Sequence, residues 1–275
     1  MALQAEAIGL DSVWVYDHLL FRMPDMPDSG VHEGWSILAA LAAITERVEV
    51  GMLVTGLRLR NPGLLAKIAA TVDEVSGGRL ILGVGAGWHD PELEAFGYPT
   101  DNRIGRFEEA LEVLVPLIRS GAADFQGRWA TARTAVMLPP ARPDIPILIA
   151  ARGPRMLGLT ARHADMSNLA WFAGADDPIL AQRTAALDAA CEADGRDPAT
   201  LVRTVGVYIR LPGATTPSPV RGQEGQPQVT EDPEAVLRGF ADAGFAHAVV
   251  WLDPMNEDSL ARLGEAAVHP GASAI

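Results

Sequence analysis

The sequence lacks or is poor in cysteine, long apolar runs and a secretory signal, and each of these absences excludes a class of protein. It has one cysteine, Cys191, so it forms no disulfide within the chain and no cysteine-based metal cluster. It has no run of about 18 apolar residues, which argues against a membrane span. Its first residues lack the pattern of a secretory signal. We therefore expect a cytoplasmic protein that has no membrane partner.

Positive charge is also scarce. Lys67 is the only lysine, and 22 basic residues stand against 35 acidic ones, which gives a formal net charge of −13. A chain this acidic has no long-range attraction to nucleic acid. An anionic ligand must then be held by local donors, such as a helix N-terminus or a single arginine. The six histidines lack the spacing of a metal site, so we expect no bound metal.

Apolar residues are abundant, at 48% of the chain, and they form short strand-like runs. These runs alternate with helical patterns in which apolar residues recur at i, i+3 and i+4. This alternation predicts parallel strands joined by helical crossovers. The number of repeats favours an α/β (β/α)8 TIM barrel over an open doubly wound sheet. The predicted strands cover residues 12–17, 48–56, 79–87, 145–151, 164–171, 202–210 and 247–253.

Turn and cap residues punctuate the chain. Gly77 and Gly121 mark helix ends. No change of composition marks a second domain, so we expect a single domain over residues 1–275. The Pro- and Gly-rich stretch 212–230 predicts a loop after a strand, on the face where a lid would lie. Helix starts are predicted at Asn61-Pro62, Asp90-Pro91, Gly153-Pro154, Asp177-Pro178 and Asp232-Pro233.

The order of elements at the beginning departs from that of a complete barrel. A helical pattern at residues 3–9 precedes the first strand-like run, although a barrel of this kind begins with a strand. We therefore expect that the first β-strand is missing from the given sequence. About 15–25 upstream residues would supply such a strand and its lead-in.

Residues capable of chemistry gather at the C-terminal ends of the predicted strands, where parallel α/β folds bind their ligands. Asp17 and His18 end the first run, and a histidine can give or take a proton near neutral pH. A loop histidine without chemistry is the alternative interpretation. Trp88 and Trp171 also lie at strand ends, where they either form the wall of a substrate pocket or pack in the core.

Two glycine-containing turns follow strands. The stretch GVGAGW at 83–88 lacks the third glycine of a dinucleotide-binding fingerprint, but its glycines permit close backbone approach to a ligand. In AARGPR at 150–155 a strand runs into Gly153-Pro154, which opens a helix. The free N–H groups of that helix predict an anion site with Arg152 or Arg155 beside it; an ordinary strand-to-helix turn is the alternative.

Five stretches together resemble the luciferase-like monooxygenase superfamily, and most closely its branch that uses the deazaflavin coenzyme F420. They follow one another in order over nearly the whole chain, and the family's (β/α)8 barrel agrees with the strand count. The stretches are AEAIGLDSVWVYDHL, residues 48–99 from VEVGM to FGYP, RFEEALEVL, IPILIAARGPRMLGLTARHADMSNL and FADAGFAHAVVWLDP.

The resemblance implies roles for individual residues. Asp17 and His18 match a catalytic pair at the reactive edge of the cofactor ring, in which Asp17 orients or polarises the histidine. Leu53, Val54 and Thr55 match a segment that backs the ring, with a non-proline cis peptide expected at Leu53-Val54. The other positions implied to bind the cofactor are Gly85, Ala86, Gly87, Ala150, Ala151, Arg152 and Gly153.

One position departs from the family pattern. Some deazaflavin dehydrogenases carry a glutamate after the second glycine of the GAG turn, where this sequence has Trp88 after Gly87. This departure argues against a mechanism of the sugar-phosphate-dehydrogenase type, with a carboxylic acid in that role.

The resemblance implies an oxidoreductase that transfers a hydride between coenzyme F420 and an unidentified small organic substrate. The alternative is an FMN-dependent monooxygenase on the same barrel, which a reductase partner supplies with reduced flavin. A third option is a truncated barrel that binds a ligand or partner without catalysis. A homodimer is compatible with these interpretations.

Overall fold

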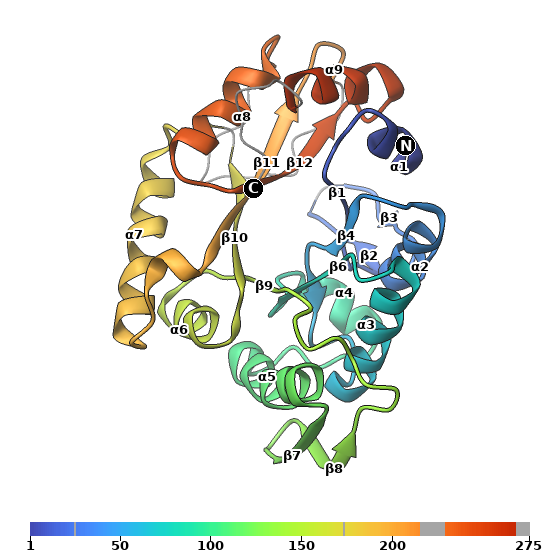
Figure 1. Ribbon diagram of the computed structural model, residues 1–275, viewed down its shortest axis with the longest axis vertical. Coiled ribbons are helices and arrows are strands. Elements are labelled where there is room, and N and C mark those ends of the chain that lie inside the picture. The colour runs from blue at the N-terminus through green and yellow to red at the C-terminus, as the bar shows by residue number, and fades with distance from the viewer. Residues whose placement is uncertain (25, 173, 215–228, 268–275) are drawn as a thin grey trace. The chain divides into compact units, whose positions relative to one another are not determined.

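The computed structural model describes residues 1–24, 26–172, 174–214 and 229–267. The chain divides into two compact units, one of residues 14–149 and one of residues 1–13 with the residues from 150 onward. Each unit combines parallel strands with helices, as the sequence predicts (Figure 1). The single domain over residues 1–275 stays a prediction, and most of the expected loop at 212–230 lies outside the described residues.

The unit of residues 14–149 is built on strands in the order β1, β4, β6, β9, with the short β5 also paired to β6. The pairs of β6 with β4, β5 and β9 are parallel, so their carboxyl ends lie at one edge. β6 is buried along its whole length, as expected for a strand covered on both faces. The strands are β1 (Ser12–Val15), β4 (Glu49–Met52), β5 (Thr55–Gly56), β6 (Leu80–Gly85) and β9 (Ile147–Ala150).

Helices of this unit begin and end close to the predicted residues. The side chain of Asn61 accepts hydrogen bonds from Gly63 and Leu64 and caps α3, which Gly77 ends at φ 70°. α4 begins one residue before the predicted Asp90-Pro91 start, with His89 as its N-cap. The helices are α2 (Gly34–Ile44), α3 (Pro62–Ser76), α4 (Asp90–Ala95) and α5 (Arg103–Ser120).

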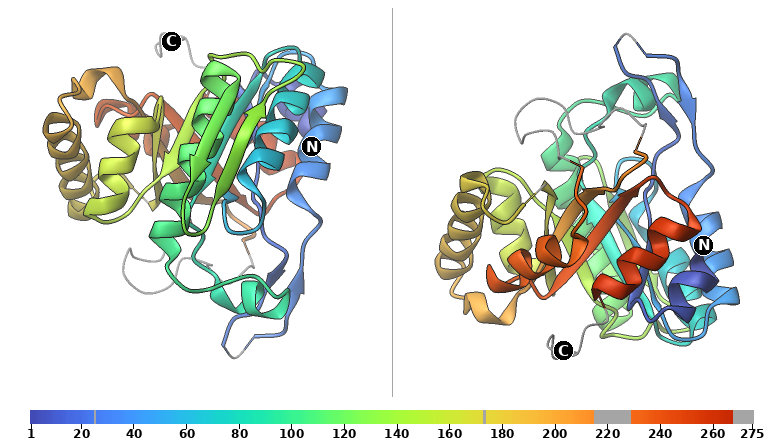
Figure 2. Two further views of the ribbon diagram at one scale, coloured as in Figure 1. Left: turned by 90° about the horizontal axis from the view of Figure 1, so that it is seen from below. Right: turned by 90° about the horizontal axis from the view of Figure 1, so that it is seen from above.

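Two antiparallel hairpins were not expected. The strands of the longer one are mostly exposed and lack a buried apolar face, which is why the sequence pattern does not reveal them. Its tip is held by Glu109 of α5, which accepts N–H groups of Arg128, Trp129 and Ala130. Figure 2 shows this hairpin, in light green, beside α5. The hairpins are β2 (Leu20–Phe21) with β3 (Ser29–Gly30), and β7 (Ala122–Gln126) with β8 (Thr131–Val136).

Two glycines of β6 make room for the chain itself. A Cβ on Gly83 would lie 1.8 Å from the backbone oxygen of Met52, and one on Gly85 would lie 2.6 Å from a methyl carbon of Val54. The missing side chains therefore let the segment after β4 lie against β6. The sequence suggested that these glycines let a ligand approach the backbone. In the structure, Met52 and Val54 of the same chain occupy the space beside them.

The second unit contains the parallel strands β10, β11 and β12 in that order. Phe172, Val207, Phe240 and Leu252 belong to its apolar core. β11 and β12 have the bounds that the sequence predicts. The elements are α1 (Ala2–Ala7), α6 (Pro154–His163), β10 (Met166–Phe172), α7 (Pro178–Ala193), the 3-10 helix η1 (Pro198–Thr200), β11 (Val202–Arg210), α8 (Pro233–Asp242), β12 (His247–Asp253) and α9 (Glu257–Ala267).

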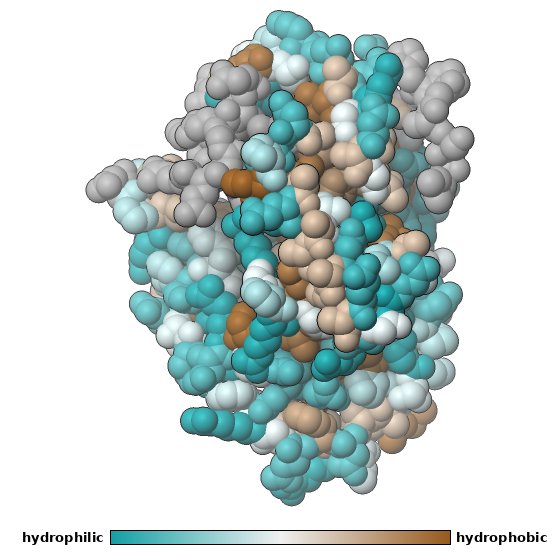
Figure 3. Space-filling model, turned by 90° about the vertical axis from the view of Figure 1, so that its left-hand side faces the viewer, coloured by the Kyte–Doolittle hydropathy of each residue, from teal (hydrophilic) through white to brown (hydrophobic). Residues whose placement is uncertain are grey.

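In helix α7 the buried side is difficult to recognise from the sequence, because apolar alanines also occur on the exposed side of the helix. Its buried residues are Leu180, Leu187 and Cys191, which follow one side of the helix. Alanines are exposed on the other side, among them Ala185 and Ala189. Figure 3, which views the side on which α7 lies, shows pale apolar residues among hydrophilic ones. The thiol of Cys191 is thus a packed side chain, and burial raises its pKa.

The order of elements at the beginning is helix α1 and then strand β1, as the sequence predicts. Among the described residues, no helix combines the length and apolarity that a membrane crossing requires.

Candidate active site

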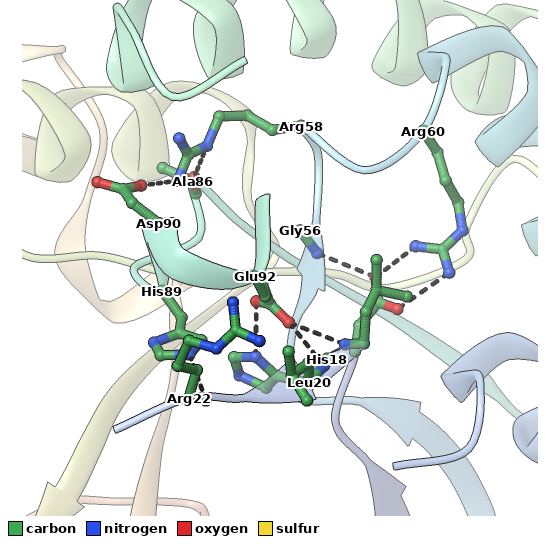
Figure 4. Close-up of polar contacts among 12 residues, drawn as sticks. His18, Leu20, Arg22, Gly56, Arg58, Arg60, Ala86, His89, Asp90 and Glu92 are labelled. Atoms are coloured by element: carbon green, nitrogen blue, oxygen red, sulfur yellow. Dashed lines mark hydrogen bonds and ion pairs between the residues drawn. The ribbon is translucent and has the colours of Figure 1, made fainter. Parts of the chain in front are cut away.

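The candidate site lies at the carboxyl ends of strands in the unit of residues 14–149 (Figure 4). His18 follows β1, and its Nδ1 lies 2.8 Å from Oε1 of Glu92 on α4. The other oxygen of Glu92 accepts the N–H of Leu19 at 2.8 Å and that of Leu20 at 3.4 Å. One carboxylate therefore holds both the imidazole and the backbone that follows it.

The charge of Glu92 determines which nitrogen of His18 carries a proton. Burial opposes ionisation, but the hydrogen bonds from His18 and the two N–H groups lower the pKa of the Glu92 carboxyl below its usual value. An ionised carboxylate only accepts, so Nδ1 of His18 is the donor. The lone pair of the neutral ring is then on Nε2, which has no hydrogen-bond partner among the described residues. His18 is thus arranged to take a proton at Nε2.

Aromatic rings surround His18. The ring centroid of Phe21 lies 4.4 Å from that of His18, and the centroid of Trp88 lies 5.6 Å away in an edge-on arrangement. Trp88 is 56% exposed, so its indole forms the outer wall beside the imidazole. The side chain of Trp171 lies outside the described part of the structure.

Asp17 is buried and faces Arg60. Two guanidinium nitrogens of Arg60 lie 2.5 Å and 3.0 Å from the two carboxylate oxygens of Asp17, and the N–H of Gly56 donates to the same carboxylate at 3.2 Å. Glu33, the N-cap of α2, also binds this guanidinium. Burial raises the pKa of Asp17, and its bonds from Arg60 and Gly56 oppose the shift.

These contacts change the role expected for Asp17. It was expected to orient or polarise His18, but the hydrogen bond to that imidazole comes from Glu92. Asp17 instead joins the end of β1 to Gly56 of β5 and, through Arg60, to the start of α2. A carboxylate does stand beside His18, although from position 92 and not from position 88.

The segment after β4 has the backbone form that the resemblance implies. The peptide bond between Leu53 and Val54 is cis, which confirms that expectation. Thr55 follows it and is buried, and its hydroxyl has no hydrogen-bond partner among the described residues. A buried hydroxyl without a partner is uncommon in proteins, so Thr55 is a group that a ligand could satisfy.

The GAG turn is held by Arg58, whose side chain is buried. Its Nε donates to the backbone oxygen of Ala86 at 3.0 Å, and its Nη2 lies 3.0 Å from Oδ1 of Asp90. Gly87 has φ 73°, which glycine adopts without strain, and a Cβ there would lie 3.3 Å from the Arg58 guanidinium. Arg103 binds the other oxygen of Asp90 at 2.7 Å. The turn and the start of α4 are therefore fixed together.

Four residues of this site were not predicted from the sequence: Arg58, Arg60, His89 and Glu92. Two of them left a signal, because Arg58 and Arg60 interrupt the apolar run GLRLRNP directly after a predicted strand. Buried arginine in such a position needs a partner, and here the partners are Asp90 and Asp17.

A groove of about 760 Å³ is lined in part by Arg60. Leu19, Trp35, Arg60, Leu64 and Tyr98 are among its lining residues, whereas His18 and Trp88 are not.

The predicted anion site lies in the second unit. Gly153 is the N-cap of α6 with φ 79°, and within the described part of the chain no side-chain hydrogen bond caps that helix. Arg152 donates to the backbone oxygen of Ala170 at 3.0 Å. Ala150 ends β9, and Ala151 follows it as a buried residue. The N-terminal end of α6 therefore stays a predicted anion site, and Arg152 already has a backbone partner.

Solved structures of known proteins share the fold over most of the chain. An F420-dependent secondary alcohol dehydrogenase, in complex with an F420–acetone adduct, matches with a TM-score of 0.76 at 20% identity, over 96% of this chain and 92% of that one. Monooxygenase RslO1 from Streptomyces bottropensis matches with a TM-score of 0.66 at 22% identity, over 96% and 88%. These similarities confirm the predicted TIM-barrel fold.

Curated relatives are closer in sequence. Pyrimidine monooxygenase RutA of Escherichia coli (strain SMS-3-5 / SECEC) is 33% identical over 185 residues, which are 64% of this chain and 48% of the relative. RutA of Cronobacter sakazakii (strain ATCC BAA-894) is 31% identical over 183 residues, 64% of this chain and 51% of the relative. The matched region is thus about half the length of these relatives.

The family model described as luciferase-like monooxygenase matches residues 1–259, nearly the whole chain. This match confirms the expected superfamily. The chain therefore belongs to the luciferase-like monooxygenase family.

Proposed function

We propose that this protein is a monooxygenase that uses reduced FMN to oxidise a small organic molecule, with His18 as the residue that exchanges a proton with the substrate. The observation that carries the proposal is the His18–Glu92 pair beside the exposed residue Trp88. Choosing FMN over F420 relies on the relatives that are pyrimidine monooxygenases. A nitrogen-containing ring is therefore the first substrate class to test.

The chain's own residues support proton transfer at a defined atom. Glu92 holds the proton of His18 on Nδ1, which leaves Nε2 free to accept one from a bound substrate. The ring cannot turn away without breaking its bond to a buried carboxylate. Phe21 and Trp88 cover the imidazole and limit the access of water to it.

The residues near His18 fit a flat redox cofactor in two respects. Thr55 offers a buried hydroxyl without a partner, next to the Leu53-Val54 peptide that would back the ring. The turn Gly85–Gly87 is held rigidly by Arg58 and would present its backbone. Bound reduced flavin would supply two electrons to dioxygen, so that one oxygen atom enters the substrate and the other leaves as water.

Anion binding is proposed for Ala150, Ala151, Arg152 and Gly153. It is supported by the start of α6, where no side-chain cap is present among the described residues. A phosphate or other anionic group of the cofactor is the ligand that such N–H groups bind best. A reductase partner that delivers reduced FMN completes the proposal.

Hydride transfer with coenzyme F420 is the second candidate, because a histidine held by a carboxylate also suits that reaction. When an alcohol is oxidised, the carbon loses a hydride to the deazaflavin and the oxygen loses a proton, which Nε2 of His18 would take. The structural neighbour that oxidises secondary alcohols with F420 motivates this test, although at 20% identity it shows the fold alone.

The experiment compares the two cofactors on the same protein. Tryptophan fluorescence is titrated with FMN and with F420, and turnover is then measured with uracil, reduced FMN and dioxygen, and with a secondary alcohol and F420. We expect tighter FMN binding and uracil-dependent product formation beyond the oxygen consumed without substrate. Binding of F420 alone, with alcohol-dependent reduction, would replace the first candidate by the second. No binding of either cofactor would contradict both.

A further inference from the structure

His89 is a buried imidazole beside His18, and the proposed proton transfer does not involve it. It is 4% exposed, at the N-cap of α4. Its Nε2 lies 3.0 Å from the backbone nitrogen of Arg22, which donates its N–H. Acceptance at Nε2 assigns the proton of the neutral ring to Nδ1. His89 therefore bonds to the chain segment that follows His18.

That segment, Leu19–Arg22, is attached to the first turn of α4 on both sides of Phe21. Glu92 accepts the N–H of Leu20 on one side, and His89 accepts the N–H of Arg22 on the other. Between these two bonds, the ring centroid of Phe21 lies 4.4 Å from that of His18 and 6.2 Å from that of His89. The position of Phe21 is thus fixed from both neighbours along the chain.

We infer that His89 is a positioning residue of the His18 site, which holds Arg22 so that Phe21 packs against the reactive imidazole. The inference deepens the proposed function and rests on it for the role of His18. It assigns two tasks to one turn of α4. Glu92 keeps the proton of His18 on Nδ1. His89 positions Phe21, whose ring packs against the imidazole of His18.

The charges around His89 favour the neutral ring that this bond requires. Burial lowers the pKa of His89 below its usual value, and His18 acts in the same direction. Glu92 and Asp90, both on α4, act in the opposite direction without reversing the shift. At neutral pH the ring therefore accepts the N–H of Arg22. Protonation, which requires a pH below the usual imidazole value because the pKa of His89 is lowered, would replace this acceptor by a donor and break the bond.

Two variants distinguish the effect of the hydrogen bond between His89 and Arg22 from the effect of the packing of the His89 ring. His89→Phe keeps an aromatic ring of similar size but has no acceptor, whereas His89→Gln keeps an acceptor that does not titrate. Asp28→Asn is the matched control, because it removes the exposed ion pair of the Arg22 side chain and leaves the backbone N–H in place. All are made in the full chain.

The first measurement needs no cofactor. Amide hydrogen exchange of Arg22 and the ring signals of His18 are followed by NMR between pH 5 and 8. We expect exchange about five- to tenfold faster in His89→Phe, as for the loss of one hydrogen bond, with shifted His18 signals because Phe21 moves. His89→Gln and Asp28→Asn should match the parent at pH 8. As the pH is lowered until His89 is protonated, the parent and Asp28→Asn should lose this protection, whereas His89→Gln should keep it.

The second measurement is turnover with the cofactor that binds. We expect kcat to fall about 10- to 100-fold in His89→Phe, as for a misplaced reacting group, with recovery in His89→Gln. Unchanged Arg22 exchange and His18 signals in His89→Phe would overturn the inference. So would recovery of exchange in His89→Gln without recovery of kcat. If the parent has no turnover, the proposed function fails, and the NMR result still decides whether His89 holds Arg22 and Phe21.

Discussion

The imidazole of His18 and the carboxylate of Glu92 come from positions 74 residues apart and meet at 2.8 Å. The pair joins the end of β1 to the first turn of α4, so the geometry of the proposed reaction depends on both segments. The neighbouring residues Asp17 and His18 therefore have different roles, because Asp17 binds Arg60 and His18 binds Glu92.

The pair predicts a graded loss of activity. We expect His18→Ala to lower kcat by about 10²–10⁴-fold with a smaller effect on cofactor binding, since the proton acceptor is lost. Glu92→Gln should lower kcat by about 10²-fold, because its amide cannot accept from His18, Leu19 and Leu20 as the carboxylate does. Glu94→Gln, an exposed position on the same helix, is the control. A kcat for His18→Ala within threefold of the parent would remove His18 from the mechanism.

Asp17 is expected to matter for stability. Asp17→Asn leaves Arg60 without its bidentate partner, and we expect a loss of about 3 kcal/mol in the free energy of unfolding, measured in urea. A double-mutant cycle with Arg60→Met should show that the two changes are not additive. A variant Asp17→Asn that is as stable as the parent but inactive would restore the catalytic role expected from the sequence.

Gly83 is expected to tolerate no side chain. Since a Cβ would lie 1.8 Å from the backbone oxygen of Met52, Gly83→Ala should cost more than about 3 kcal/mol or prevent folding. Gly158 in α6 is the matched control, because a Cβ there meets no atom within 4 Å. Gly158→Ala should gain about 0.5–1 kcal/mol. Thermal unfolding of both variants checks the contrast, and equal melting temperatures would contradict it.

His247 is expected to make the protein less stable in acid. Burial lowers its pKa in the folded chain below the value of about 6.5 that it has when unfolded. Between these two pKa values the unfolded chain binds more protons, so stability falls as the pH falls from about 6.5 to the folded pKa. In His247→Gln this part of the pH dependence should be absent. Urea unfolding between pH 5 and 8 measures it, with the exposed His32→Gln as control.

Glu109 is expected to hold the β7–β8 hairpin. Although burial opposes its ionisation, the N–H groups of Trp129, Arg128 and Ala130 lower the pKa of the carboxyl. Glu109→Gln should cost about 1–3 kcal/mol, the range for a hydrogen-bonded charged group. It should also speed amide exchange at Trp129. Unaltered exchange there would mean that the packing of Trp129 on Gly105 is sufficient.

The fold follows from patterns that are local in the sequence. β11 and β12 have the predicted bounds, because long apolar runs flanked by turn residues determine them without help from other segments. The predicted strand 48–56 is in fact β4 and β5 with the Leu53-Val54 cis peptide between them. That interruption was predictable only from the family resemblance. The exposed β7–β8 hairpin lacks such a pattern and was missed.

The site was predicted less completely, because its pairs connect distant segments. Asp17 and His18 are adjacent in sequence, and adjacency suggested that they cooperate. After a strand, however, successive side chains point in different directions, and the two residues bind Arg60 and Glu92 respectively. No spacing rule links position 18 to position 92. The pairing of such residues is a property of the folded chain.

The rigid hold of Arg58 on the GAG turn has a consequence for protein engineering. For an exchange of loops between family members, residues 85–92 look like a self-contained unit. In this protein Ala86 and Asp90 both depend on Arg58, which lies outside that stretch, and Glu92 serves Leu19 and Leu20. If residues 85–92 alone were transferred to another protein, the contacts of Ala86 and Asp90 with Arg58 would be lost. The transferable unit includes Arg58 and the segment from His18 to Arg22 as well.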